Sequence, residues 1–537
     1  MVYGGKPSTG CHLCRKRKIK CDEARPGCRN CTIYGRPCPG YRPTSDSVFR
    51  NETTKVERQV KKSIVPDPTS ASLTVSQKSE SPGTLDHYNG NSSMSNNSLS
   101  LINIADASWE ERAICYFFDQ FISPPDKESG MGHLDYLPGL YSRIRQHKSA
   151  SSSLPWALEA TALMTLANVS QAPQLIIQAR RGYGRALSTL RRALASPTEA
   201  LKDETFASVV LLSLFEDVTG ERNGLFSSHT AGFEFLMKLR GESQLNNSQG
   251  RNMFSFAYAH TYVEILALGD KPRVDMDFII DQFNGTVDPV ERLMLATSKI
   301  RKVFLAMQTS SSPPDITTVQ EWIAAGEECE REVSQWSLHL PDHWLPLIVY
   351  SNQGEPLITY NSIAYCVVWN YHRAARVMIQ QLLLNLNHTL SAILSKTKEP
   401  NGPLIEKAAL DETKLRAVIQ EMTADVSRSL QFAMADVDTL GRPTVSSEAR
   451  NPSRAGHVYG LLWPLWYIVS CGMPTPDQVK LICTVLHRIG HTHGIVLASI
   501  LAREAEKLPV NVTSNSIQAP PPYFGEVELA ALLRSHT

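Results

Sequence analysis

Hydrophobic residues recur at helical spacing through most of the chain from about Leu101 onward. Apolar positions three and four residues apart, interrupted by polar, Pro or Gly breaks, are typical of helices that pack on a common core. The alternating pattern of a half-buried strand is nearly absent. The pattern therefore predicts a large all-α C-terminal domain over residues 101–537. The candidate helices are Trp109–Ile122, Pro155–Val169, Pro173–Ala195, Glu204–Val218, Ser227–Leu239, Asn252–Leu268, Val290–Met307, Thr317–Trp336, Ile358–Ser395, Leu404–Ala435, Val458–Cys471 and Pro476–Lys507.

Two polar segments precede this helical region. Residues 64–100 are dominated by Ser, Asn, Thr, Pro and Gly, and they hold too little apolar surface to offset the entropy of ordering them. We expect a disordered linker there. Residues 41–63 are basic and are expected to form a linker or one short helix. Val56 and Val60 supply at most two weak heptads, fewer than a coiled coil needs, so dimerisation through this segment stays open.

The first ten residues are short, polar and glycine-containing, and we expect a flexible arm over 1–10 without the hydrophobic part of a secretory signal. Further along, no stretch reaches the roughly 18 apolar residues of a membrane span. The longest candidate, Leu461–Met473, is broken by Pro464. We therefore expect no membrane among the partners.

Charge is distributed unevenly along the chain. The formal net charge of the 537 residues is only +1, with 42% hydrophobic and 20% charged residues, enough for a large core. Residues 1–62, however, hold fifteen lysines and arginines against five acidic residues, and the remainder holds 39 against 48. A basic head on an acidic body is expected of a tethered nucleic-acid-binding module.

Six of the eleven cysteines lie in one short segment, as C-x2-C-x6-C written twice with an offset of 17 residues. Each half offers three thiolates, one fewer than a closed tetrahedral zinc site needs. Two tetrahedral zinc ions have eight ligand positions, and six sulfurs can fill them if two of the sulfurs each bind both ions. The symmetry of the repeat indicates that the bridging residues are the first cysteine of each half, Cys11 and Cys28. The predicted ligands are Cys11, Cys14, Cys21, Cys28, Cys31 and Cys38.

Three disulfide bridges are the alternative arrangement of six cysteines. Thiols of cytosolic and nuclear proteins stay reduced, and the chain starts without a hydrophobic signal, so zinc is favoured. RING and LIM domains fit poorly, because the spacing differs and no histidine occupies a ligand position. The pattern predicts a two-zinc cluster that holds together a segment with almost no apolar core.

The two halves of the cysteine repeat differ in charge. The chain reads RKRKIK between Cys14 and Cys21, but TIYGRP between Cys31 and Cys38. A short helix starting near His12 would carry the basic residues of the first half out of the cluster, where they could enter the major groove of DNA. A solvated face or a nuclear-import signal is the alternative for such a charge run. The basic residues are Arg15, Lys16, Arg17, Lys18 and Lys20.

This spacing, with CRKRKIKC inside it and Pro26 in the connecting loop, resembles the fungal Zn2Cys6 binuclear cluster family of transcription factors. The resemblance implies a DNA-binding module over 11–40, with two short helices around two Zn²⁺. It also implies binding to double-stranded DNA in the nucleus and regulation of RNA polymerase II transcription. The first helix of such proteins meets a CGG-type triplet. By position, the implied base contacts are Arg17 and Lys18, and the implied phosphate contacts are Arg15, Lys16 and Lys20.

Three segments of the helical region, YGRALSTLRRAL, TFASVVLLSLFED and FSSHTAGFEFLMKLRG, resemble the fungal-specific transcription factor regulatory domain. The resemblance implies a regulator of metabolic or secondary-metabolite biosynthetic genes that contacts the transcription machinery or co-regulators, and it is compatible with a homodimer. No P-loop, dinucleotide fingerprint, nucleophile elbow or HExxH motif occurs, so we expect no enzyme. The likeness is carried by Leu211, Leu212, Phe215, Glu216, His229, Gly232, Leu236, Arg240 and Gly241.

Other candidate residues of the helical region have simpler explanations. His487 and His491 are spaced as a possible metal pair, with His493 nearby, but no third ligand is evident. The five remaining cysteines are expected to be small buried side chains, and Trp463 and Trp466 to pack in the core. The acidic and hydrophobic C-terminal tail could be an activation element or a docked helix.

The alternative function is a zinc-dependent protein-interaction module whose helical domain senses a metabolite, with no direct reading of DNA. The charge asymmetry between the two halves of the repeat disfavours this alternative.

Overall fold

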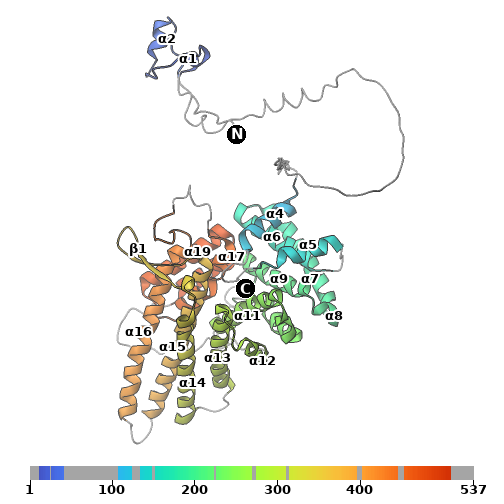
Figure 1. The fold of residues 1–537 in the computed structure, drawn as a ribbon, viewed down its shortest axis with the longest axis vertical. Helices are drawn as coiled ribbons and strands as arrows, with labels where there is room; N and C mark the ends of the chain where they lie inside the picture. The colour runs from blue at the N-terminus through green and yellow to red at the C-terminus, as the bar shows by residue number, and fades with distance from the viewer. Residues whose placement is uncertain are drawn as a thin grey trace, which may run out of the picture. The chain divides into compact units, whose positions relative to one another are not determined.

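The computed structural model describes residues 11–24, 26–40, 107–123, 134–147, 152–222, 225, 227–268, 274–309, 314–395, 402–444 and 453–508. The chain divides into two compact units, residues 1–98 and 99–537, which we describe separately (Figure 1). The expected arm over 1–10, basic segment over 41–63 and linker over 64–100 lie outside the described residues.

The first unit contains two short helices, α1 (His12–Lys16) and α2 (Arg29–Ile33). Each begins at a cysteine whose Sγ accepts a hydrogen bond from the backbone N–H three residues later, so Cys11 and Cys28 act as N-caps. Helices of five residues are unstable alone. Buried cysteine side chains form the core between them, which confirms the predicted small module.

The second unit is mainly helical, as predicted. Its α-helices are α4 (Trp109–Phe121), α5 (Leu137–His147), α6 (Leu154–Ser170), α7 (Pro173–Leu194), α8 (Pro197–Ala200), α9 (Asp203–Thr219), α10 (Thr230–Arg240), α11 (Ser248–Leu268), α12 (Asp277–Ile280), α13 (Pro289–Thr309), α14 (Ile316–Gln335), α15 (Ile363–Leu394), α16 (Gly402–Ala433), α17 (Ala455–Tyr459), α18 (Leu462–Ser470), α19 (Pro476–His493) and α20 (Val496–Lys507). Short 3-10 turns connect several of them, including η5 (Trp336–His339).

Central helices of this unit are apolar on nearly all faces. Most side chains of α6 and α9 are buried, as expected for helices surrounded by others. The long helices α15 and α16 lie side by side, with α14 against α15 (Figure 1). A second group of buried residues from α13, α14 and α15 fills the space between these helices, including Ile300, Val333 and Leu382. No described helix has both the length and the apolar character that crossing a membrane requires.

One hairpin interrupts the helical pattern. Strands β1 (Leu347–Tyr350) and β2 (Pro356–Thr359) pair antiparallel, with Leu347 opposite Thr359 and Tyr350 opposite Pro356. The predicted helix starting at Ile358 is therefore wrong over its first residues, because they belong to β2 and α15 starts after its N-cap Ser362.

Some of the predicted segments were expected to contain more than one helix, and two of them are each divided in two. The segment predicted as Pro476–Lys507 breaks at Gly494, whose φ of 69° ends α19 before α20 begins. A side chain could not replace this glycine without strain, because a Cβ would lie 2.9 Å from Cβ of Asn168. The segment predicted as Val458–Cys471 likewise divides into α17 and α18. Helices α5, α8 and α12 were not predicted.

Candidate metal centre and nucleic-acid interface

The six cysteines of the repeat converge on one core. Their Sγ atoms form two groups of four in which all four atoms lie within 4.8 Å of one another, and both groups contain Cys11 and Cys28. The Sγ atoms of these two residues are 3.6 Å apart. Thiolates bound to one tetrahedral zinc at about 2.3 Å lie about 3.8 Å apart. The arrangement therefore fits two four-coordinate zinc ions with two shared sulfurs. The groups are Cys11, Cys14, Cys21, Cys28 and Cys11, Cys28, Cys31, Cys38.

The chemistry of the sulfurs also fits a bound cation. Burial raises the pKa of the Cys14 thiol to about 12, and it also raises the pKa of the Cys31 thiol. For Cys21 burial has the same effect, but hydrogen bonds from the backbone of Cys11 and Glu23 outweigh it and the pKa falls to about 7. Metal ligation needs thiolates. The buried sulfurs can be deprotonated together only if a positive charge such as zinc compensates them.

The basic segment follows directly from this core. Helix α1 ends at Lys16, Arg17 caps it, and Lys18 adopts the left-handed conformation with a φ of 56°. The predicted helix carrying all the basic residues is thus too long, since only Arg15 and Lys16 lie inside it. The N–H of Ile19 turns back to donate to the carbonyl of Cys14 (3.1 Å). Among the five basic side chains, Arg15 is partly buried and the other four are exposed.

Residues of the second half of the repeat support the basic segment. The guanidinium carbon of Arg17 lies 3.5 Å from the centroid of the Tyr34 ring, a cation–π contact. The side-chain amide of Asn30 donates to the carbonyl of Lys20 (2.7 Å). Neither Tyr34 nor Asn30 was singled out from the sequence. Tyr34 occupies the position in the second half of the repeat that Arg17 occupies in the first. This replacement of a basic residue by an aromatic one was the signal that the sequence offered.

The loop between the two halves contains Pro26, which is exposed. The residue before it lies outside the described residues. Next to it, a Cβ at Gly27 would lie 3.1 Å from Cβ of Cys38, so the loop passes close to the cluster. The carboxylate of Asp22 accepts from the N–H of Arg29 (3.0 Å), which joins the loop to the start of α2.

Comparison with known proteins covers both units. The family model for the fungal Zn(2)-Cys(6) binuclear cluster domain matches residues 9–47, and the model for the fungal specific transcription factor domain matches residues 145–399. Residues 9–47 therefore carry a fungal Zn(2)-Cys(6) binuclear cluster domain, and residues 145–399 are similar to the fungal specific transcription factor domain. The cluster domain binds two zinc ions. The two matches support a DNA-binding regulator of transcription.

Three relatives illustrate how the similarity is distributed. The chain is 46% identical over 48 residues to the Zn(2)-C6 fungal-type transcription factor afumD of Aspergillus fumigatus, which covers 9% of this chain and 13% of that protein. It is 54% identical over 39 residues to the aspercryptin biosynthesis cluster-specific transcription regulator atnN of Emericella nidulans, 7% of this chain and 6% of that protein. Transcription factor dbaG of Emericella nidulans is 23% identical over 424 residues, which covers 74% of this chain and 93% of that protein.

The similarity to the first relatives is confined to short segments. The chain spans between 6% and 23% of the length of the first three relatives that it matches. No solved structure matches the chain.

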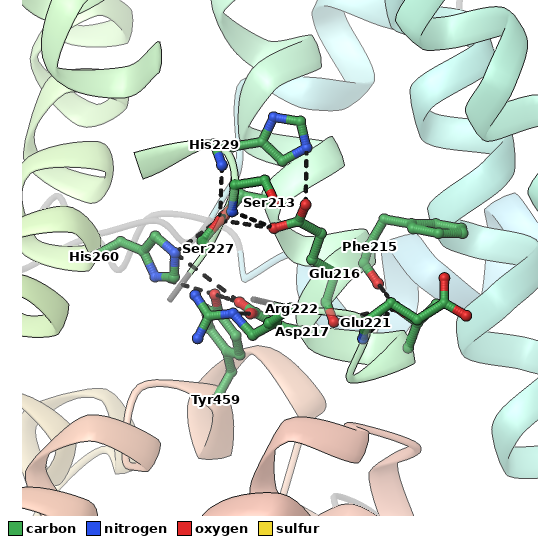
Figure 2. A network of polar contacts seen from close by, with 12 residues as sticks. Ser213, Phe215, Glu216, Asp217, Glu221, Arg222, Ser227, His229, His260 and Tyr459 are labelled. Atoms are coloured by element: carbon green, nitrogen blue, oxygen red, sulfur yellow. Dashed lines mark hydrogen bonds and ion pairs between the residues drawn. The ribbon is translucent and has the colours of Figure 1, made fainter. Parts of the chain in front are cut away.

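The residues that carry the second resemblance include part of a buried polar network at the end of α9 (Figure 2). The carboxylate of Glu216 accepts from the hydroxyl of Ser227 and from the N–H of Ser228, both at 2.9 Å. Nε2 of His229 lies 3.5 Å from the same carboxylate. Burial lowers the pKa of His229 in spite of this carboxylate. Glu216 therefore holds the segment before α10 against α9.

The next residue of α9 continues the network toward other helices (Figure 2). Asp217 is completely buried, with Nε of Arg222 at 3.2 Å, and it accepts from the hydroxyl of Tyr459 on α17 (2.5 Å). That hydroxyl also lies 3.1 Å from Nδ1 of His260 on α11, whose Nε2 is 3.3 Å from Oγ of Ser213. The network thus joins α9, α11 and α17 in the core.

The other residues of this resemblance serve packing and helix ends. Leu211, Leu212 and Phe215 are core residues. Arg240 donates to the Asp203 carboxylate (2.6 Å), and Gly241, with a φ of 61°, ends α10.

The histidines near the C-terminal end of α19 do not form a metal site. Nε2 of His487 pairs with Glu506 (3.0 Å), whereas His493 is buried with Nε2 2.7 Å from the carbonyl of Ser453. Within the described ranges, the two cysteine groups are the only sets of three or more His, Cys, Asp or Glu side chains whose donor atoms lie close enough together to hold one metal ion.

The expected buried cysteines and aromatic residues follow the prediction with one exception. Trp463 and Trp466 are part of the core. Cys329, Cys366, Cys471 and Cys483 are buried, but Cys115 is exposed on α4, so the prediction is wrong there. The expected C-terminal activation element lies outside the described residues.

Proposed function

We propose that this chain is a sequence-specific, zinc-dependent transcription factor of RNA polymerase II genes that recognises CGG-type triplets in double-stranded DNA. The observation that carries the proposal is the mostly exposed basic segment over 15–20, attached to a buried core of cysteines. The major groove is about 12 Å wide and admits a helix, so a short basic element on a rigid support is suited to enter it.

The proposed zinc ligands are the six cysteines of the repeat. Cys11 and Cys28 belong to both groups of four sulfurs, so they are the proposed bridges. The bound ions would neutralise the thiolates and link the two halves of the repeat. Because each bridging cysteine also caps a helix, the same two side chains would couple metal binding to the start of α1 and α2.

Arg17 and Lys18 are the proposed base contacts, since both follow the end of α1 and are exposed. A guanidinium stacked on the face of Tyr34 keeps its in-plane N–H groups free to donate, which suits bidentate bonding to guanine O6 and N7. The proposed phosphate contacts are Arg15, Lys16 and Lys20. Pro26 is proposed to shape the loop that brings the two halves together.

The proposed target is a metabolic or secondary-metabolite biosynthetic gene set. The name of the relative atnN, a biosynthesis cluster-specific transcription regulator, supports this direction. The transcription machinery or co-regulators are the proposed protein partners, and the active form is proposed to be a homodimer, in the nucleus.

Selection of bound DNA from a random library tests the proposal with the full chain, in zinc and after chelation. We expect a CGG-containing sequence to be enriched only with zinc. Arg17→Ala with Lys18→Ala should relax the triplet, whereas Arg191→Ala, an exposed arginine on α7, should not change it. Failure to enrich any sequence would contradict the proposal and favour a zinc-dependent interaction module instead.

A further inference from the structure

The two halves of the cysteine repeat fold in the same way. The N–H of Ile19 donates to the carbonyl of Cys14 (3.1 Å), and at the matching positions of the second half the N–H of Arg36 donates to the carbonyl of Cys31 (3.2 Å). Each of these hydrogen bonds closes the turn that follows a five-residue helix. The backbone after α2 therefore repeats the backbone after α1, so a difference in function between the halves lies in their side chains.

The left-handed residue of this turn differs between the halves. Gly35 has a φ of 71°, and Lys18 occupies the matching position of the first half with a φ of 56°. Glycine adopts this conformation freely, whereas the Cβ of a lysine disfavours it. A residue in such a conformation persists only where the surrounding structure holds it. The first half therefore needs a support for Lys18 that the second half does not need at Gly35.

Helix α2 and its C-cap contact the chain on both sides of Lys18. On the N-terminal side, the ring of Tyr34 stacks on the guanidinium of Arg17. On the C-terminal side, Nδ2 of Asn30 donates to the carbonyl of Lys20 (2.7 Å). The left-handed residue thus lies between two contacts that come from the second half of the repeat.

The contact from Asn30 is made in one direction only. At the matching positions of the other half, Leu13 takes the place of Asn30, and Pro37 takes the place of Lys20. An aliphatic side chain has no donor, so α1 cannot make the equivalent hydrogen bond to the second half. Asn30 is followed by Cys31, which is part of the buried cysteine core, so the cluster fixes the position of the amide donor.

We propose that Asn30 is a positioning residue for the reading of DNA. By holding the carbonyl of Lys20, it fixes the turn from which the side chain of Lys18 is directed at the bases. This role rests on the proposed function, in which Lys18 contacts base edges. Direct readout needs donors in defined positions, whereas flexible lysine side chains reach phosphates from several backbone conformations. Loss of the hydrogen bond should therefore reduce the preference for one sequence more than the binding to DNA in general.

Asn30→Ala in the zinc-loaded full chain tests the role in DNA reading. Fluorescence anisotropy compares a duplex carrying the preferred sequence with one in which the triplet is scrambled. We expect the affinity for the preferred sequence to fall about three- to tenfold, roughly the effect of one hydrogen bond. The affinity for the scrambled duplex should change by less than about twofold, and both zinc ions should be retained.

Thr32→Ala is the matched control for this variant. The hydroxyl of Thr32 also donates to a backbone carbonyl, but to that of Cys28 at the start of the same helix (3.4 Å). Its loss should change neither affinity. Asn30→Asp is a second test, because a carboxylate has nearly the same shape as the amide but cannot donate to the carbonyl of Lys20. It should lose sequence preference as Asn30→Ala does.

Hydrogen exchange followed by mass spectrometry measures the positioning without DNA. The N–H of Ile19 lies in the turn between Lys18 and Lys20, and it is protected by its hydrogen bond to Cys14. In Asn30→Ala this bond should open more often, so the amide should exchange at least about threefold faster than in the wild type. Thr32→Ala should exchange like the wild type.

The outcomes distinguish this role from the proposed function. A wild type without a preferred sequence would contradict the proposed function, and the exchange of the Ile19 amide would still decide whether Asn30 holds the turn. An Asn30→Ala protein with wild-type sequence preference, or with wild-type exchange at Ile19, would overturn the positioning role. Loss of zinc from this variant would overturn it as well, because Asn30 would then serve the folding of the cluster domain.

Discussion

Arg17 stacks on Tyr34, with 3.5 Å between the guanidinium carbon and the ring centroid, and the two residues come from opposite halves of the cysteine repeat. The second half lacks the basic run of the first, but it supplies the surface on which a basic side chain is oriented. This contact leads to the first prediction.

Tyr34→Ala should weaken binding to the preferred DNA sequence about two- to fivefold, because a cation–π contact at an exposed site contributes about 0.5–1 kcal/mol. Tyr34→Phe keeps the ring and should bind almost like the wild type. Fluorescence anisotropy with a labelled duplex measures both. Equal losses in the two variants would mean that the hydroxyl, rather than the stack, matters.

Lys20→Ala should weaken binding to all DNA sequences alike, because a phosphate contact carries no base information. The slope of log K against log salt should become shallower by about 0.9. Lys18→Ala should instead reduce discrimination against the wrong base by about 1–3 kcal/mol. Anisotropy titrations at several salt concentrations separate the two. A changed base preference for Lys20→Ala at an unchanged slope would reverse the roles.

Cys21→Ala should lower the zinc content below two ions per chain and abolish DNA binding, because metal binding and folding of this small module are one event. Cys115→Ala is the matched control: this thiol is exposed on α4 and should not affect zinc. Elemental analysis by mass spectrometry gives the stoichiometry. Two zinc ions retained without Cys21 would refute its role as a ligand.

Asp217→Ala should destabilise the helical unit by about 3–5 kcal/mol, because it leaves the guanidinium of Arg222 buried without its carboxylate. Glu221→Ala, only four residues away, removes an exposed ion pair with Arg180 and should cost less than about 1 kcal/mol. Urea unfolding followed by tryptophan fluorescence reports on this unit alone, because all eight tryptophans lie in it. Similar losses in both variants would argue against the buried pair.

Acid should destabilise the helical unit partly through His372. Burial lowers the pKa of this histidine to about 3, against about 6.5 when unfolded, so the unfolded chain binds more protons below pH 6.5. The free energy of unfolding should be unaffected by this group above about pH 7 and should fall by about 2 kcal/mol at pH 5. His372→Gln should reduce that pH dependence. An unchanged pH profile in the variant would exclude this contribution.

Local sequence signals predicted the zinc module well. The cysteine spacing alone indicated Cys11 and Cys28 as the shared positions, because counting ligands needs no tertiary information. The end of α1 was not predicted, since the chain turns at Lys18 to bring Ile19 back to the cluster, and a run of basic residues contains no stop signal for a helix.

The helical unit shows where sequence patterns are insufficient. Strands of four residues, as in β1 and β2, are too short to stand out against neighbouring helical patterns. The contact between Asp217 and Tyr459 spans 242 residues, so nothing near either residue could reveal it. Gly494 could be seen in the sequence as a possible helix break. The close approach of Asn168, which leaves no room for a side chain at position 494, could not be seen there.

Helix α9 depends on parts of the chain that are made late. Its buried Asp217 needs Tyr459, and a Cβ at Gly220, just past its end, would lie 2.8 Å from side-chain atoms of both Val496 and Ile500 of α20. On the ribosome, the cysteine module can take up zinc as soon as residue 38 emerges, because its contacts are local. The helical unit cannot close its core until almost the whole chain has been synthesised. Nascent chains would therefore carry a folded zinc module joined to a helical unit whose core is incomplete. Termination of synthesis before α17 would release a protein with a folded zinc module and an unfolded helical unit.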